Sequence, residues 1–187
     1  MESFERFEER EMKQTHIDSW IVFVVFFVAA LPAVSSGPPP TDAQARAEFD
    51  AFSEKVSQAQ AELFRGRSAP LKALFSRASD VTLFGVLGGR GEHGWDQIAP
   101  RLDWASTQYS EGALTIERIA SYVDGNLGHV VQIEKVRFKV PGQSAPTLLE
   151  IRATWVFRRE RDGWRIVHRH ADSQLKRQGP AKTGSES

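Results

Sequence analysis

The sequence contains no cysteine, which excludes disulfide bonds, thiolate metal ligands and cysteine nucleophiles. Its 24 basic and 24 acidic residues give a formal net charge of zero, and no basic stripe favours nucleic-acid binding. The glycine-rich loop at residues 86–94 lacks the Lys-Ser/Thr pair of a P-loop and the GxGxxG pattern of a dinucleotide site. We expect this loop to be a flexible connector or a lid over a pocket.

An uninterrupted apolar run extends from Trp20 to Val34. This run is shorter than the roughly 20 residues of a membrane-spanning helix, and small residues follow it. We therefore expect residues 1–35 to contain a signal peptide that is cleaved after Ser35, which predicts a secreted or periplasmic protein. Because the segment before the run is acidic, we expect the true start to be Met12, or the first residues to be a tail. The alternative is an uncleaved segment that anchors the chain to a membrane.

A linker at residues 36–41 follows, and Thr41 or Asp42 can cap the next helix. Apolar residues then recur at helical spacing in three segments, residues 42–66, 68–78 and 95–112. A short strand is expected at residues 80–85, between the second and third of these helices.

The rest of the chain has the alternation of β-strands, up to a polar tail at residues 174–187 that we expect to be disordered. Four strands are predicted, at residues 113–123, 126–140, 147–160 and 163–173. Asp-Gly pairs between the first two and the last two predict hairpins. Helices first and antiparallel strands later predict one α+β domain, a half-open cone-shaped barrel with a small-molecule cavity at its mouth.

The segments DVTLFGVLGG, GWDQIAPRLDWAS and ATWVFRRERDGWRIVHRHADS, in this order, resemble the nuclear-transport-factor-2-like superfamily. Within it, the chain is most similar to SnoaL-like and ketosteroid-isomerase-like domains, over residues 42–173. The resemblance implies a cone-shaped α+β barrel that is often dimeric through its sheet. It does not imply one activity, because the superfamily includes isomerases, cyclases, dehydratases and modules that only bind or assemble.

The last strand carries Trp164, Ile166, His168, His170 and Asp172 at alternate positions. The large apolar residues predict that this face is buried, so the histidines and the aspartate would line a pocket or form a satisfied polar network. Histidine titrates near neutral pH, and a nearby carboxylate can orient its ring. We expect His170 to act as a general acid/base with Asp172, and His168 to bind a substrate oxygen.

Two further residues are candidates on other strands. Asp80 opens the first strand and is predicted either to act as a base beside His170 or to be a turn aspartate. His129 is in phase with an apolar face and is predicted either to bind substrate or to pack against the adjoining strand.

The strand at residues 147–160 has an apolar face that includes Trp155 and a polar face that includes Arg152. Its alternation does not determine which face lines the cavity. If Arg152 points inward, it favours an anionic ligand or a buried pair with Glu134 or Asp172. If the apolar face packs on the helices, Arg152 is solvated.

Trp104 and Tyr109 belong to the third predicted helix and are candidate ligand contacts, with a surface role as the alternative for Trp104. We expect an exported domain that binds a small apolar molecule, without cofactor or metal, and forms a homodimer through its sheet. Two functions remain open: a cofactor-independent isomerase, cyclase or dehydratase that uses His/Asp acid–base chemistry on a carbonyl-type substrate, and a non-catalytic binding or dimerisation module.

Overall fold

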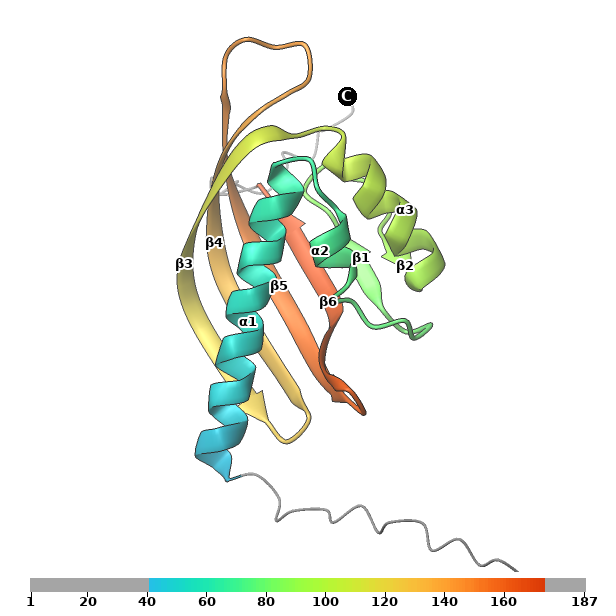
Figure 1. The fold of residues 1–187 in the computed structure, drawn as a ribbon, viewed down its shortest axis with the longest axis vertical. Coiled ribbons are helices and arrows are strands. Elements are labelled where there is room, and N and C mark those ends of the chain that lie inside the picture. Colours follow the sequence, from blue (N-terminus) through green and yellow to red (C-terminus); the bar gives the residue numbers. More distant parts are fainter. Residues whose placement is uncertain (1–40, 174–187) are drawn as a thin grey trace, which may run out of the picture. The chain divides into compact units, whose positions relative to one another are not determined.

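The computed structural model describes residues 41–173. The predicted signal peptide, the linker up to Pro40 and the predicted tail lie outside these residues. Within them are three helices, α1 (Asp42–Phe64), α2 (Ala69–Lys72) and α3 (Trp95–Ser106) (Figure 1). The strands are β1 (Thr82–Phe84), β2 (Glu92–His93), β3 (Ser110–Asp124), β4 (Leu127–Lys139), β5 (Thr147–Glu160) and β6 (Gly163–Asp172). No helix in this described part of the chain has both the length and the apolar character needed to cross a membrane.

Helix α1 begins as the sequence predicts, with Thr41 as its cap. The Gln44 amide N–H donates to Thr41 Oγ1 at 3.3 Å, and the Thr41 N–H donates to Gln44 Oε1 at 2.9 Å. This reciprocal capping box satisfies two of the donors that a helix start leaves free. The buried face of the helix includes Phe49, Val56, Ala59, Gln60, Leu63 and Phe64.

Helix α2 is much shorter than residues 68–78, so the predicted length is wrong. The chain leaves the helix because the segment after it pairs with β6 instead. Ser76 N–H donates to the Ile166 carbonyl, and Ile166 N–H donates to the Leu74 carbonyl, both at 2.9 Å. Tertiary pairing therefore overrides helical propensity at this point.

The six strands form one curved, unclosed sheet in the order β2-β1-β6-β5-β4-β3. All neighbours are antiparallel except β1 and β6, which are parallel. Helix α1 crosses the concave face of the sheet, and α3 lies towards the β1–β6 side (Figure 1). This arrangement confirms the predicted α+β, half-open fold.

The apolar core lies between α1 and the inner face of the sheet. On β5 the inner residues are Ile151, Ala153, Trp155 and Phe157, all buried. The apolar face of β5 therefore packs on the helices. This settles the ambiguity of that strand, since Arg152 lies on the opposite, outer face.

Candidate functional site

A β-bulge in β6 changes which of its side chains point inward. In the pairing of β5 with β6, Phe157 is opposite Ile166 and Val156 is opposite His168, so Val167 is the extra residue. One extra residue reverses the alternation of all that follow it. Trp164 and Ile166 are buried as the sequence predicts, but beyond the bulge the facing is inverted.

The expectation that His168, His170 and Asp172 share the buried face is therefore wrong. Arg169 and Ala171 take the inner positions, and both are buried. His170 is exposed, and its ring lies 5.6 Å from that of Phe84 on the outer face.

His168 is half-buried on the outer face, where its Nδ1 lies 2.7 Å from Thr82 Oγ1 in a hydrogen bond. Burial lowers the pKa of His168 below the usual value of 6.5, and the nearby His170 adds to this effect. The environment therefore favours the neutral imidazole.

The two candidate aspartates form ion pairs with arginines on the outside of the sheet. Asp172 accepts hydrogen bonds from Arg152 Nε at 2.9 Å and Nη2 at 2.6 Å. Asp80 accepts from Arg158 at 2.6 and 3.1 Å, and this hydrogen bonding lowers the pKa of Asp80. Neither carboxylate faces the interior. Of the two roles predicted for Asp80, the structure agrees with the turn aspartate, because Asp80 lies in a turn and pairs with Arg158 instead of His170. Arg152 has Asp172 as its partner, but at the surface.

The remaining candidates separate into two groups. His129 lies on the outer face, where its ring centroid is 5.6 Å from that of Tyr122. Trp104 is exposed on α3, and the guanidinium carbon of Arg101 lies 4.2 Å from the centroid of its ring. Trp155 and Tyr109 lie inside the fold. Tyr109 follows the end of α3 and lines a cavity inside the fold.

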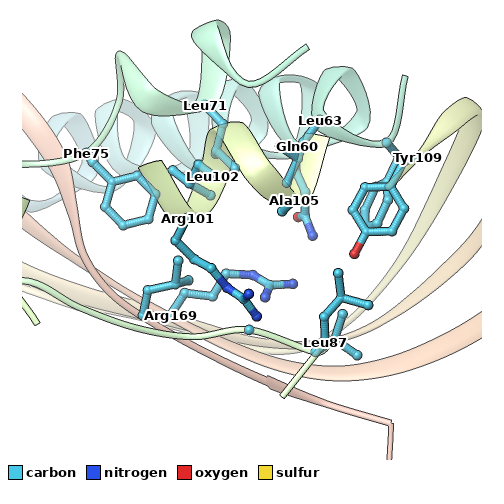
Figure 2. Close-up of a pocket in the computed structure, with 14 residues that line it drawn as sticks. Gln60, Leu63, Leu71, Phe75, Leu87, Arg101, Leu102, Ala105, Tyr109 and Arg169 are labelled. Carbon is cyan, nitrogen blue, oxygen red and sulfur yellow. The ribbon is translucent and has the colours of Figure 1, made fainter. Parts of the chain in front are cut away.

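This cavity lies between the helices and the β6 side of the sheet and has a volume of about 40 Å³ (Figure 2). Most of its wall is apolar: Leu63, Phe64, Leu71, Phe75, Leu83 and Leu102. Leu87, which is 42% exposed, belongs to the loop between β1 and β2 and marks the side nearest solvent. The glycine-rich loop thus contributes Val86 and Leu87 to the wall, and Gly85, directly before the loop, also lines the cavity.

Four polar side chains point into the space between the helices and the sheet: Gln60, Arg101, Tyr109 and Arg169 (Figure 2). Arg101 Nε lies 3.2 Å from Glu92 Oε1, and its Nη2 donates to the Gly88 carbonyl at 2.9 Å. These two contacts fix Arg101 against the loop that closes the cavity.

Arg169 is held by a buried carboxylate, Glu134, which is 0% exposed. Glu134 Oε2 accepts from Arg169 Nη2 at 2.8 Å and from Gln60 Nε2 at 2.6 Å. Its Oε1 accepts from Gln132 Nε2 at 2.8 Å and from Trp155 Nε1 at 3.0 Å. Four donors thus satisfy this carboxylate, as a buried charge requires.

Arg169 is additionally stacked on an aromatic ring, with its guanidinium carbon 4.7 Å from the centroid of Trp155. It is 7% exposed and lines the cavity, whereas Glu134 does not. The cavity therefore meets the positive member of the pair.

Tyr109 and Gln60 complete the polar part of the wall. Burial raises the pKa of Tyr109 to about 12, against the opposing effect of Arg169 and Arg101, so its hydroxyl stays protonated at neutral pH. Gln60 turns its Nε2 towards the Glu134 carboxylate, to which it donates at 2.6 Å. Gln60 Oε1 is left buried without a hydrogen-bond partner in the described structure.

This lining offers several N–H and O–H donors and one free acceptor, within an apolar enclosure. Its only titratable residues are arginines and a tyrosine, because no imidazole or carboxylate is among the described residues that line the cavity. Residues 41–173 also hold no cluster of three histidine, cysteine, aspartate or glutamate side chains suited to a metal ion. The arrangement suits recognition of an oxygen-bearing molecule.

Sequence reasoning missed Arg101, Arg169 and Gln60 as cavity residues. It named Glu134 only as a possible partner of Arg152. A signal for Glu134 was present, since β4 carries two polar residues, Gln132 and Glu134, between buried apolar ones at alternate positions. No such signal exists for Arg169, because the bulge before it is invisible in the alternation.

Comparisons with known proteins agree with this fold. A search of curated proteins found no match. Solved structures are similar to the chain at low identity. One is a candidate dehydratase of the NTF2-like family from Streptomyces avermitilis (19% identity, 73% of this chain, 100% of that chain, TM-score 0.62). Another is a ketosteroid isomerase-like protein from Erwinia carotovora atroseptica (14% identity, covering 70% of this chain and 96% of that chain, TM-score 0.57).

A third is a candidate aromatic ring hydroxylase from Novosphingobium aromaticivorans (12% identity, covering 75% of this chain and 96% of that chain, TM-score 0.59). At these identities the likeness shows the fold alone. The family comparison is more specific, because the model of the SnoaL-like domain matches residues 54–173. The chain therefore belongs to the SnoaL-like domain family.

Proposed function

We propose that this domain binds a small, largely apolar molecule in the cavity lined by Arg101, Tyr109 and Arg169. The observation that carries the proposal is the lining itself, in which convergent hydrogen-bond donors interrupt an otherwise apolar wall. Ligand sites are typically built in this way, because apolar contact supplies affinity and a few polar groups fix orientation.

The same lining favours a binding module over the acid–base enzyme that the terminal histidines suggested. Proton abstraction needs a base within hydrogen-bond reach of the substrate. His170, Asp172 and Asp80 lie on the outer side of the sheet or at its edge. Glu134 holds Arg169 at the cavity wall, but four hydrogen bonds occupy its oxygens.

An isomerase, cyclase or dehydratase acting here would have a protonated phenol, two guanidinium groups and the Gln60 amide at the cavity wall. These groups stabilise negative charge on a ligand oxygen but do not remove a proton at neutral pH. We therefore rank ligand binding above catalysis.

Thermal stabilisation by ligands tests the proposal, since a molecule that binds the folded state raises the midpoint of unfolding. The full chain is screened with lipophilic carbonyl compounds. Ala105→Met would fill the cavity from α3, and Ala113→Met on the exposed side of β3 is the matched control. Stabilisation of the wild type and of the control, but not of Ala105→Met, is expected. Equal stabilisation of all three proteins would place the ligand elsewhere and refute the proposal.

A second copy of this chain is the proposed partner of the outer face of the sheet. Large apolar side chains are exposed on several of its strands: Phe84, Tyr122, Leu127 and Leu148. Tyr122 and Leu127 line one hollow of this face together with His129, Thr154 and Val156, and exposed apolar surface of this kind is typical of interfaces. Sedimentation of the full chain is expected to show a dimer that Leu127→Glu weakens, whereas a monomer at high concentration would contradict this proposal.

Export is likewise a proposal, supported by the apolar run and small residues of segment 1–35. Mass spectrometry of the protein recovered from its native host would show a mature N-terminus at Ser36, and an intact chain would contradict it.

A further inference from the structure

We infer that the ligand of the cavity carries a carboxylate, which Arg169 and Tyr109 hold. The inference rests on the proposed function and specifies its ligand class. Arg169 is the residue on which the inference depends. It is charged, more than nine-tenths buried, and part of the cavity wall.

Arg169 has more donors than its protein partner uses. A guanidinium carries five N–H groups in a planar fork, and the Glu134 hydrogen bond engages the Nη2 end. Figure 2 shows the guanidinium reaching into the space beneath Gln60 and Ala105. A carboxylate matches this fork better than any other common small group, because it can accept two parallel hydrogen bonds.

The charged groups around the cavity favour an anionic ligand group as well. Glu134 lies behind Arg169, and its charge is dispersed over four donors. Arg101 supplies a second guanidinium from α3 and lines the same cavity as Arg169 and Tyr109. Both guanidinium groups are paired with a carboxylate, Arg101 with Glu92 and Arg169 with Glu134, so a ligand oxygen meets their remaining N–H donors and the Tyr109 hydroxyl.

Gln60 adds a requirement of the opposite kind. Its Oε1 is buried, lines the cavity region and has no donor from the described protein. An unsatisfied buried acceptor is costly, so a ligand hydroxyl that donates to it is favoured. A hydroxylated short acid satisfies both the donors and this acceptor.

The size of the cavity restricts the acid to a short one. A volume of about 40 Å³ has room for roughly three water molecules. We therefore expect acids of about three carbons to enter without displacement of the loop that carries Leu87.

Dissociation constants of lactate, propionate and lactamide for the full chain, from ligand-observed NMR, test the inference. Lactate is expected to bind most tightly, propionate more weakly, and lactamide at least about tenfold more weakly than lactate, because it lacks the charge. Lactamide that binds as tightly as lactate would overturn the inference. Propionate that binds as tightly as lactate would overturn the role given to Gln60.

Two variants locate the carboxylate. Tyr109→Phe keeps the ring contacts to Phe64 and Phe138 and removes only the hydroxyl, and Tyr122→Phe on the outer face is its control. Lactate affinity is expected to fall about tenfold in the first variant and to remain unchanged in the second. An equal affinity in both would overturn the assignment.

The pair Arg169→Met with Glu134→Gln removes both charges together, so that no carboxylate is left buried alone. Arg165→Met, on the same strand, is its control. Loss of lactate binding in the pair only is expected, and retention would overturn the inference. Lipophilic carbonyl compounds distinguish failure of the carboxylate inference from failure of the proposed function. If they stabilise the protein while no acid binds, the carboxylate inference fails alone; if neither class binds, the proposed function fails too.

Discussion

Removing Arg169 alone should destabilise the protein far more than removing a surface arginine. In Arg169→Met, the Glu134 carboxylate stays 0% exposed and loses its only cationic hydrogen-bond partner, at 2.8 Å. A buried ion pair broken from one side costs about 3–5 kcal/mol, because the remaining charge is left uncompensated. Three neutral donors still contact Glu134, so we expect about 3 kcal/mol, the lower end of that range.

The surface pair of Arg152 with Asp172 gives the matched comparison. Its side chains are 52% and 33% exposed, and exposed ion pairs contribute about 0–1 kcal/mol. Arg152→Met is therefore expected to lower the free energy of unfolding by less than about 1 kcal/mol. Both arginines reach a carboxylate at short distance, so burial alone accounts for the difference.

Urea unfolding of the full chain measures these changes as shifts of the midpoint at constant slope. Glu134→Gln is made alone and together with Arg169→Met. Each single variant leaves the other residue buried without its partner. The double variant should therefore lower the free energy of unfolding by about 2 kcal/mol less than the sum of the two single variants. If the single effects add within about 0.5 kcal/mol, the described coupling is refuted. A double variant that stays folded where a single one does not would show the same coupling.

Three further predictions follow from other parts of the structure. His170→Ala should change the free energy of unfolding by less than about 0.5 kcal/mol in urea titrations, because the side chain is exposed; a large loss would refute its outer position. Gly128→Ala should cost about 1–3 kcal/mol, since a Cβ there overlaps the Phe49 ring, and an unchanged midpoint would contradict this packing. The lowered pKa of His168 makes its contribution to stability complete above pH 6.5, and it declines as the pH falls through that value because the unfolded chain binds the proton first. The urea midpoint should therefore fall between pH 7.5 and 5.5 more steeply in the wild type than in His168→Asn, and parallel slopes would contradict it.

Elements with strong local signals could be predicted from the sequence. Helix α1 and its Thr41 cap follow from helical spacing and a polar residue at the start. Both Asp-Gly pairs lie at hairpin turns, where Gly125 and Gly163 have positive φ angles of 56° and 116°. The resemblance to SnoaL-like domains is confirmed by the family comparison.

The candidate site could be predicted only in part, since it depends on one residue of register. Tyr109 lines the cavity, although it follows α3 and does not belong to it, and Arg169 replaces the histidines because Val167 is an extra residue in β6. Alternation before the bulge is correct for Trp164 and inverted after it. Nothing in the local sequence marks the bulge, because the pairing of β5 with β6 is a tertiary property.

The central claim is that the binding site lies on the concave side of the sheet, with Arg169 and Tyr109, and not on the outer side with the histidines. Intermolecular nuclear Overhauser effects from the methyl protons of bound lactate test it directly. We expect the lactate methyl protons to contact the Tyr109 ring and the Leu102 methyl groups, which line the cavity. Contacts with the imidazole protons of His168 and His170 instead would contradict it.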